Sequence, residues 1–142
     1  MGAADVDPVR AAEELVEAFN AADWERVRER LASDAVYAET GTGRRVEGAD
    51  AYVELLQGWK EAFPDVRGTV RNAVGTHSTA AQEILWEGTH SGPLQTPAGV
   101  LEASGRSISV EASLWSTFEG DQAREVHHYL DVMTLLQQIG GA

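Results

Sequence analysis

The chain has 142 residues, of which 11 are Lys or Arg and 23 are Asp or Glu, so its formal net charge at pH 7 is −12. This length predicts one domain, residues 1–142, with room for a full core and one pocket. An acidic chain without a basic run is a poor partner for nucleic acid or an anionic membrane, and the absence of cysteine excludes disulfides, thiol nucleophiles and Cys-bound metal. Because the first ten residues do not resemble a signal peptide, we expect a cytoplasmic protein.

Three helices are predicted in the first half of the chain. Asp7 is a suitable N-cap for the first helix, with Pro8 at the first helical position. Asp23 can cap a short second helix, and a third is expected over residues 50–63, closed by Pro64. Apolar residues of the first helix recur every three or four positions: Val9, Ala12, Leu15, Val16 and Phe19. This spacing gives the helix one apolar face that must pack against another element.

The rest of the chain is predicted to be mostly strand. A short strand over residues 36–40 leads through the turn 41–43 to a hairpin partner over 44–47. Further strands are expected over residues 66–74, 82–90, 108–118 and 123–131, followed by a short helix over 132–139. Helices followed by consecutive strands indicate an α+β fold. We expect a strongly curved antiparallel or mixed sheet, shaped like a cone, with the N-terminal helices on its concave face.

The last strand carries the most informative pattern. Alternation places Glu125, His127, Tyr129 and Asp131 on one face of the strand. If this face meets solvent, it is an ordinary polar surface. If it faces a pocket, it supplies a carboxylate, an imidazole and a phenol for acid/base chemistry.

Asp131 is the residue that we expect to carry this chemistry. It also has a structural interpretation as the N-cap of the last helix. In an apolar pocket, burial would raise the pKa of its carboxyl and make it an acid or base near neutral pH.

His90 lies at the end of a predicted strand, between Gly88 and Gly92. A lone His there is either a structural hydrogen-bonding group or a second catalytic candidate. We expect no metal site, because the adjacent pair His127 and His128 points to opposite sides of a strand. We also expect no nucleotide or other cofactor, since no Gly-rich phosphate loop is present.

Several segments together resemble the SnoaL-like polyketide cyclases of the NTF2-like superfamily. The resemblance extends from about Val9 to Gly140. It depends on the order and spacing of Phe19-Asn20-Ala21 with Trp24, Phe63-Pro64-Asp65, residues 88–94, His128-Tyr129-Leu130-Asp131 and residues 135–140.

The resemblance implies ring closure of a polyketide by intramolecular aldol condensation, without metal or nucleotide. It also implies that Asp131 abstracts a proton next to a carbonyl. The known cyclases carry a His on the preceding long strand, whereas residues 113–117 of this chain contain none. We therefore expect His90 or His127 to take that place, or a different reaction. The residues that we expect to bind substrate are Tyr129, Trp115, Trp59, Trp86, Phe63 and Tyr37.

Two other functions remain open from the sequence. One is an epoxide-opening hydrolase or isomerase on the same fold, which is disfavoured because no Arg shares the face of Asp131 on the last strand. The other is a protein that binds a small molecule without catalysis. In each case the partner is a hydrophobic small molecule, and a homodimer is expected through the outer face of the sheet, which needs cover.

Overall fold

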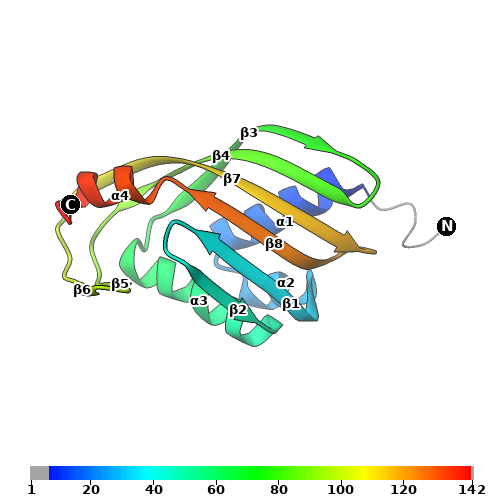
Figure 1. Ribbon diagram of the computed structural model, residues 1–142, viewed down its shortest axis with the longest axis horizontal. Helices are drawn as coiled ribbons and strands as arrows, with labels where there is room; N and C mark the ends of the chain where they lie inside the picture. The colour runs from blue at the N-terminus through cyan, green and yellow to red at the C-terminus, as the bar shows by residue number, and fades with distance from the viewer. Residues whose placement is uncertain (1–6, 142) are drawn as a thin grey trace.

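The structure, a computed structural model, describes residues 7–141, and its elements follow the predicted order (Figure 1). The helices are α1 (Pro8–Asn20), α2 (Trp24–Glu29), α3 (Ala49–Ala62) and α4 (Val132–Ile139). The strands are β1 (Leu31–Thr40), β2 (Arg44–Glu47), β3 (Arg67–Gly75), β4 (Thr79–Thr89), β5 (Leu94–Thr96), β6 (Gly99–Leu101), β7 (Ser107–Glu119) and β8 (Gln122–Leu130).

Aspartates begin three of the helices. The carboxylate of Asp7 accepts the backbone N–H of Val9 at the start of α1, and that of Asp23 accepts the N–H of Arg26 at the start of α2. These bonds satisfy backbone donors that have no partner within the helix. Both predicted caps are confirmed, and Asp131 has the same role at α4.

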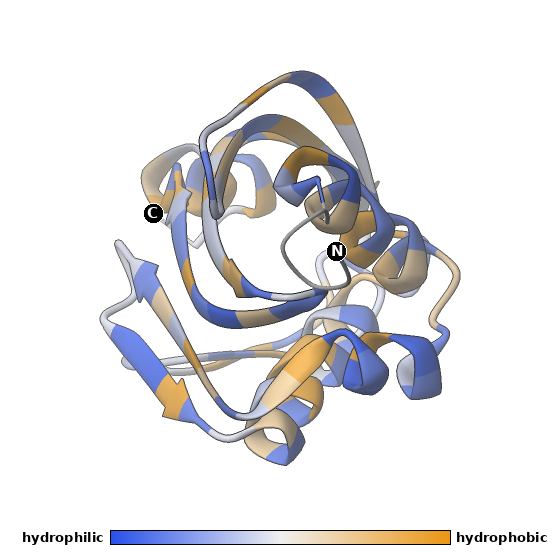
Figure 2. Cartoon of the chain, turned by 90° about the vertical axis from the view of Figure 1, so that its right-hand side faces the viewer, coloured by the Kyte–Doolittle hydropathy of each residue, from blue (hydrophilic) through white to orange (hydrophobic). Residues whose placement is uncertain are grey.

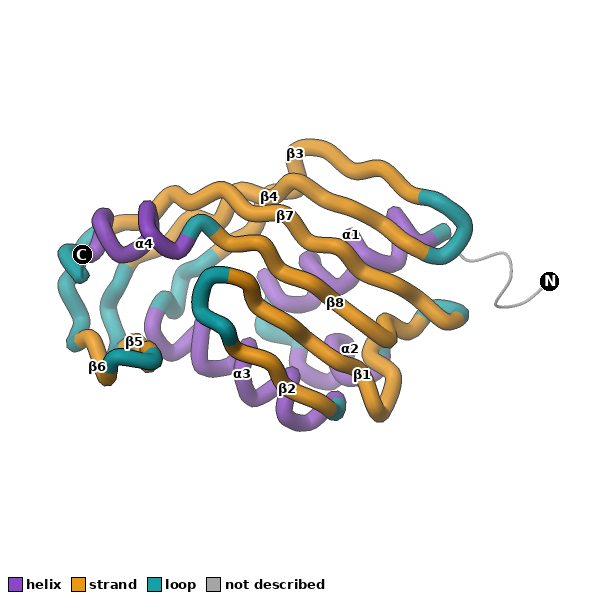
Figure 3. The backbone as a smooth tube through the Cα atoms, viewed as in Figure 1, coloured by secondary structure: helices purple, strands orange, loops and turns teal. Residues whose placement is uncertain are grey.

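Six strands form one mixed sheet in the order β2-β1-β8-β7-β4-β3. All neighbours are antiparallel except β1 and β8, which run parallel. The tube view shows β1 beside β8 and the helices α1, α2 and α3 together on one side of the sheet (Figure 3). The sheet curls strongly, and hydrophobic and hydrophilic residues alternate along its strands (Figure 2). The α+β prediction, with N-terminal helices on the concave face, is confirmed.

Two features of the strands differ from the prediction. The first strand begins at Leu31 rather than at Val36, with an irregular register between these residues. The strands β5 and β6, which pair as a separate two-stranded sheet, were not predicted. Both are strands of three residues, too short to show a period.

Polar side chains fasten the helices to the edge of the sheet. The amide of Asn20, at the end of α1, bonds the backbone of Gly68 on β3 in both directions, at 2.9 Å and 2.8 Å. Beyond α3, the carboxylate of Asp65 accepts the backbone N–H and the hydroxyl of Thr89. These bonds fix the distance between the helices and β3–β4, and so the width of the space between them.

No helix within residues 7–141 is both long enough and apolar enough to span a membrane.

Candidate active site

A cavity lies between the concave face of the sheet and the helices α1 and α3. It encloses about 90 Å³, several times the roughly 10–15 Å³ that one water molecule requires by the same measure. Its aromatic lining residues are Phe19, Tyr37, Tyr52, Trp59, Phe63 and Trp86. A mostly apolar cavity with a few polar groups is typical of a small-molecule site.

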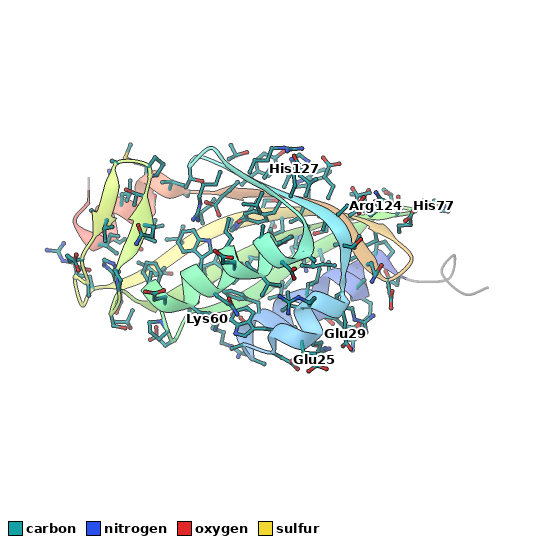
Figure 4. The ribbon with its side chains drawn as sticks, turned by 90° about the horizontal axis from the view of Figure 1, so that it is seen from below. Glu25, Glu29, Lys60, His77, Arg124 and His127 are labelled. Carbon is teal, nitrogen blue, oxygen red and sulfur yellow. The ribbon has the colours of Figure 1, made fainter. Side chains whose placement is uncertain are left out.

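The two faces of β8 differ in whether they meet this cavity. Val126, His128 and Leu130 line it, whereas His127 and Tyr129 belong to the opposite face by alternation. His127 lies on the side of the sheet opposite Lys60 of α3 (Figure 4). The histidine in the cavity wall is therefore His128.

His128 takes part in a chain of hydrogen bonds that joins three strands of the sheet. Its Nδ1 lies 2.7 Å from the hydroxyl of Tyr37 on β1. The Tyr37 hydroxyl donates to Oε2 of Glu39, also on β1, at 2.5 Å. On the other side of the ring, the indole N–H of Trp86 on β4 donates to Nε2 of His128 at 3.2 Å.

These bonds assign the proton positions on the neutral imidazole. Because Nε2 accepts from Trp86, the ring proton is assigned to Nδ1. Nδ1–H then donates to the oxygen of Tyr37, whose own proton goes to Glu39. His128 is thus left with its lone pair at Nε2, beside the N–H of Trp86.

Glu39 is a buried carboxylate, with 2% of its surface exposed. Besides Tyr37, its oxygens accept from the hydroxyl of Thr42 at 2.6 Å, from the guanidinium of Arg44 at 3.0 Å and from the indole of Trp59 at 3.3 Å. Burial raises the pKa of Glu39, but the hydrogen bonds and the charge of Arg44 together outweigh it, and the pKa lies below its ordinary value. Glu39 is therefore ionised at neutral pH.

Burial has the opposite effect on His128, because its charged form is the cation. Desolvation lowers the pKa of His128 to about 4, although the Glu39 carboxylate pulls it upward. The pKa of Tyr37 is raised well above its usual value, mainly by burial and then by the charge of Glu39. At pH 7 the chain therefore consists of a neutral imidazole, a neutral phenol and a carboxylate.

Asp131 does not lie in the cavity, and the expectation that it is buried there is wrong. Its side chain is exposed and accepts the backbone N–H and the hydroxyl of Thr134 in the first turn of α4. These hydrogen bonds lower the pKa of Asp131, the reverse of the predicted rise. The residue directly follows β8, where the chain turns into the helix.

Tyr129, Trp115 and His127 also lie outside the cavity, contrary to the prediction. Trp115 is 50% exposed and Tyr129 is 46% exposed. Trp115 is the register partner of His127 on the outer face, and the rings of His127 and Tyr129 stack at 6.5 Å. These aromatic residues belong to the face through which the homodimer is expected, and that homodimer stays a prediction.

His90 is buried but does not line the cavity. Its Nδ1 accepts the backbone N–H of Ser104 at 3.1 Å, and its ring packs against Phe63. Its backbone also pairs with Gly105 and Arg106. His90 therefore has a structural role, holding together the two ends of the segment that carries β5 and β6.

The remaining predicted site residues, Trp59, Trp86, Phe63 and Tyr37, line the cavity. Their contact with a substrate stays a prediction. Neither Glu39 nor His128 was predicted as a site residue from the sequence. A signal for Glu39 was present, since it shares one face of a predicted strand with Tyr37.

Within residues 7–141, no group of three or more His, Cys, Asp or Glu side chains is arranged to hold a metal ion. Near the cavity, the imidazole of His128 and the carboxylate of Glu39 are 3.9 Å apart at their nearest polar atoms. The oxygens of Glu39 are already used by Arg44, Thr42 and Tyr37.

Solved structures share this fold over nearly their whole length. IdmH from Streptomyces antibioticus, a proposed polyketide cyclase, is 27% identical with a TM-score of 0.80 over 95% of this chain and 99% of that chain. A proposed SnoaL-like polyketide cyclase from Jannaschia sp. CCS1 is 17% identical, with a TM-score of 0.82 over 97% and 98%. An LEH-like epoxide hydrolase from M. tuberculosis is 14% identical, with a TM-score of 0.72 over 93% and 88%, and shows the fold alone.

No curated protein matches the sequence. A family model described as SnoaL-like polyketide cyclase matches residues 9–139. Since this match covers almost the whole chain, the protein belongs to the SnoaL-like polyketide cyclase family.

Proposed function

We propose that the protein binds a hydrophobic carbonyl compound in its cavity and moves a proton at the carbon next to the carbonyl, leading to intramolecular aldol ring closure. The observation that carries this proposal is the pair formed by Nε2 of His128 and the indole N–H of Trp86. They lie 3.2 Å apart in the wall of an apolar cavity. His128 is the proposed base, in place of the Asp131 expected from the sequence.

Enolisation requires two groups close together. One accepts the proton from the α-carbon, and the other donates a hydrogen bond to the oxygen on which charge develops. When a ketone enters the cavity, its oxygen replaces His128 as the acceptor for Trp86. The lone pair on Nε2 is then free to take the α-proton.

The steps balance without an oxidant or a reductant. The C–H electron pair becomes the enolate, while the proton moves to Nε2 of His128. The enolate carbon then attacks a second carbonyl of the same molecule, and a C–C bond forms. The resulting alkoxide recovers the proton from Nε2, which restores neutral His128.

The ion pair formed in the first step is stabilised by the chain behind His128. The imidazolium donates from Nδ1 to Tyr37, whose hydroxyl bonds the carboxylate of Glu39. A base with a pKa of about 4 is not strong. A comparable carboxylate base, with a pKa of about 4.6, works in ketosteroid isomerase because strong donors stabilise the oxyanion. The proposal therefore depends as much on Trp86 as on His128.

The aromatic walls supply the second requirement of a ring closure. A flexible chain has to be held with its two reacting carbons in contact. Trp59 and Phe63 of the α3 region form one wall of the cavity, with their rings stacked at 6.1 Å. Trp86 and Phe19 also line the cavity, with 5.4 Å between their ring centroids.

The test uses deuterium exchange, which needs no knowledge of the natural substrate. The methyl protons of 2-acetonaphthone, an apolar aryl ketone, are followed by NMR in buffered deuterium oxide. We expect the protein to accelerate their exchange and His128→Gln to lower this acceleration about 100-fold or more, the usual contribution of a general base. The matched control is His127→Gln, one residue away on the outer face of the same strand.

Equal exchange by wild-type protein and His128→Gln would overturn the proposal, and so would the absence of acceleration by the wild type. If 2-acetonaphthone binds without any exchange, the result favours the non-catalytic binding protein that the sequence leaves open. Melting curves of both variants show whether each is folded.

A further inference from the structure

Gln82 on β4 is a buried polar residue without a partner. Only 1% of its surface is exposed, and it lines the cavity. Neither its amide nitrogen nor its amide oxygen has a hydrogen-bond partner. Buried amides are nearly always paired in folded proteins, because an unpaired donor or acceptor loses its bonds to water without replacement.

The position of Gln82 relative to His128 is fixed by the register of the sheet. Gln82 on β4 is the partner of Leu114 on β7, and Leu114 is the partner of His128 on β8. Register partners on neighbouring strands point to the same face of a sheet. Two strand spacings place the Cα atom of Gln82 about 10 Å from the Cα atom of His128.

Between these two polar residues the floor of the cavity is apolar. Leu114 lies directly between them in the register, and Ser116, a buried residue that also lines the cavity, is its neighbour on the same face of β7. A ligand that contacts both His128 and Gln82 therefore needs an apolar body with a polar group at each end.

We propose that Gln82 determines substrate specificity by binding a hydroxyl group at the end of the substrate remote from the reacting carbonyl. A hydroxyl satisfies both orphaned atoms, since it donates to the amide oxygen and accepts from the amide nitrogen. A second ketone would satisfy only the nitrogen. Building on the ketone chemistry proposed for His128, the substrate class becomes a hydroxylated aromatic or polycyclic ketone.

The experiment compares two probes that differ by one group. Both 2-acetonaphthone and 6-hydroxy-2-acetonaphthone carry the methyl ketone at one end of a rigid bicyclic ring, and only the second carries a hydroxyl at the other end. Their dissociation constants are measured by fluorescence titration. Wild-type protein is expected to bind the hydroxylated probe about 10- to 100-fold more tightly, because the probe without a hydroxyl leaves the buried amide unpaired.

Gln82→Leu is expected to abolish this preference by weakening only the hydroxylated probe. The variant should melt at the same temperature as the wild type or higher, since it removes two unsatisfied polar atoms. Gln82→Met is a second replacement of similar length if the branched side chain does not fit. Glu83→Gln, the next residue on the outer face of β4, is the matched control and should keep the preference.

The outcomes separate this inference from the function on which it rests. In His128→Gln, loss of exchange with the preference for the hydroxyl intact supports both. Three results would show that Gln82 does not bind a hydroxyl of the ligand. The wild type binds the two probes equally, the wild type does not bind the hydroxylated probe, or the Gln82→Leu variant keeps the preference. An ordered water on Gln82 would give the first of these results, equal binding of the two probes by the wild type. The exchange assay with 2-acetonaphthone decides the role of His128 separately in every case.

Discussion

His128 and Glu39 are register partners on the parallel strands β8 and β1, and the hydroxyl of Tyr37 connects their side chains. The pairing continues to Arg44 on β2, which neutralises Glu39. A buried charge is tolerated where it is paired and hydrogen-bonded. The register of β8, β1 and β2 thus places Glu39, with its charge balanced by Arg44, next to the imidazole of His128. The strands β1 and β8 are the only pair of the six-stranded sheet that runs parallel.

The stability of the protein should depend on pH through His128. The pKa of this histidine is about 4 in the folded protein, against an ordinary value of 6.5. Between these values the unfolded chain binds a proton that the folded protein does not, so acid favours unfolding. The free energy of unfolding should therefore fall as pH falls from 6.5 to 4, by on the order of 3 kcal/mol from this residue.

Denaturant titrations across this pH range measure the slope. His128→Gln should flatten it, whereas His127→Gln should leave it as in the wild type. A slope that is the same in all three proteins would show that other groups carry the dependence.

Tyr37→Phe should impair catalysis while leaving ketone binding intact. The phenyl ring keeps the packing against Tyr52, at 4.8 Å between ring centroids, but Nδ1–H of His128 loses its link to Glu39. A hydrogen bond to a charged group contributes about 1.5–3 kcal/mol, which predicts a loss of roughly 10- to 100-fold in the exchange rate. The decrease should be in kcat, with KM unchanged. An equal change in both would indicate that Tyr37 shapes the cavity rather than supporting His128.

Alternation along β8 predicted which residues share a face, but not which face meets the cavity. The more polar face, with His127, Tyr129 and Asp131, was predicted to be the one that meets the cavity. The structure buries the other face because Val126 and Leu130 supply apolar surface, and His128 is buried with them. A single polar residue within an apolar face was therefore the better signal of a buried site.

The connection between Glu39 and His128 had no local signal in the sequence. The two residues are far apart along the chain, and their strands pair in parallel through long connections. Hydrophobic periodicity and capping residues predict individual helices and strands, because both depend only on residues that are close together in the sequence. Pairing between β1 and β8 depends on how the whole sheet curls, which no local pattern determines.

The outer face of the sheet should hold two copies of the chain together. Trp115 and Tyr129 are large aromatic side chains that are half exposed there. Replacement of Trp115 by Lys puts a charge at the centre of this face and should convert a dimer into a monomer in sedimentation velocity. Val74→Lys on the edge strand β3 is the control for added charge alone. A wild-type protein that sediments as a monomer at micromolar concentration would exclude this dimer.

Gly68→Ala should disturb the proposed active site from a strand that does not reach His128. Gly68 on β3 is the register partner of Trp86, and a Cβ there would lie 2.5 Å from the indole ring. The amide of Asn20 bonds both the backbone N–H and the backbone carbonyl of Gly68. Because these bonds hold the Gly68 backbone in place, the indole of Trp86 has to move to make room for the methyl group. The hydrogen bond from Trp86 to His128 then lengthens, and overpacking costs about 1–3 kcal/mol of stability.

Gly58→Ala is the contrasting substitution. Gly58 lies within α3, and a Cβ there would meet no atom within 4 Å. Alanine at this position should raise stability by roughly 0.5–1 kcal/mol through helix propensity and leave deuterium exchange unchanged. Gly68→Ala should instead lower the exchange rate and shift the tryptophan fluorescence. If Gly68→Ala exchanges 2-acetonaphthone as fast as Gly58→Ala, the position of Trp86 is not important for the reaction, and the proposed role of its N–H as the donor to the enolate oxygen is wrong.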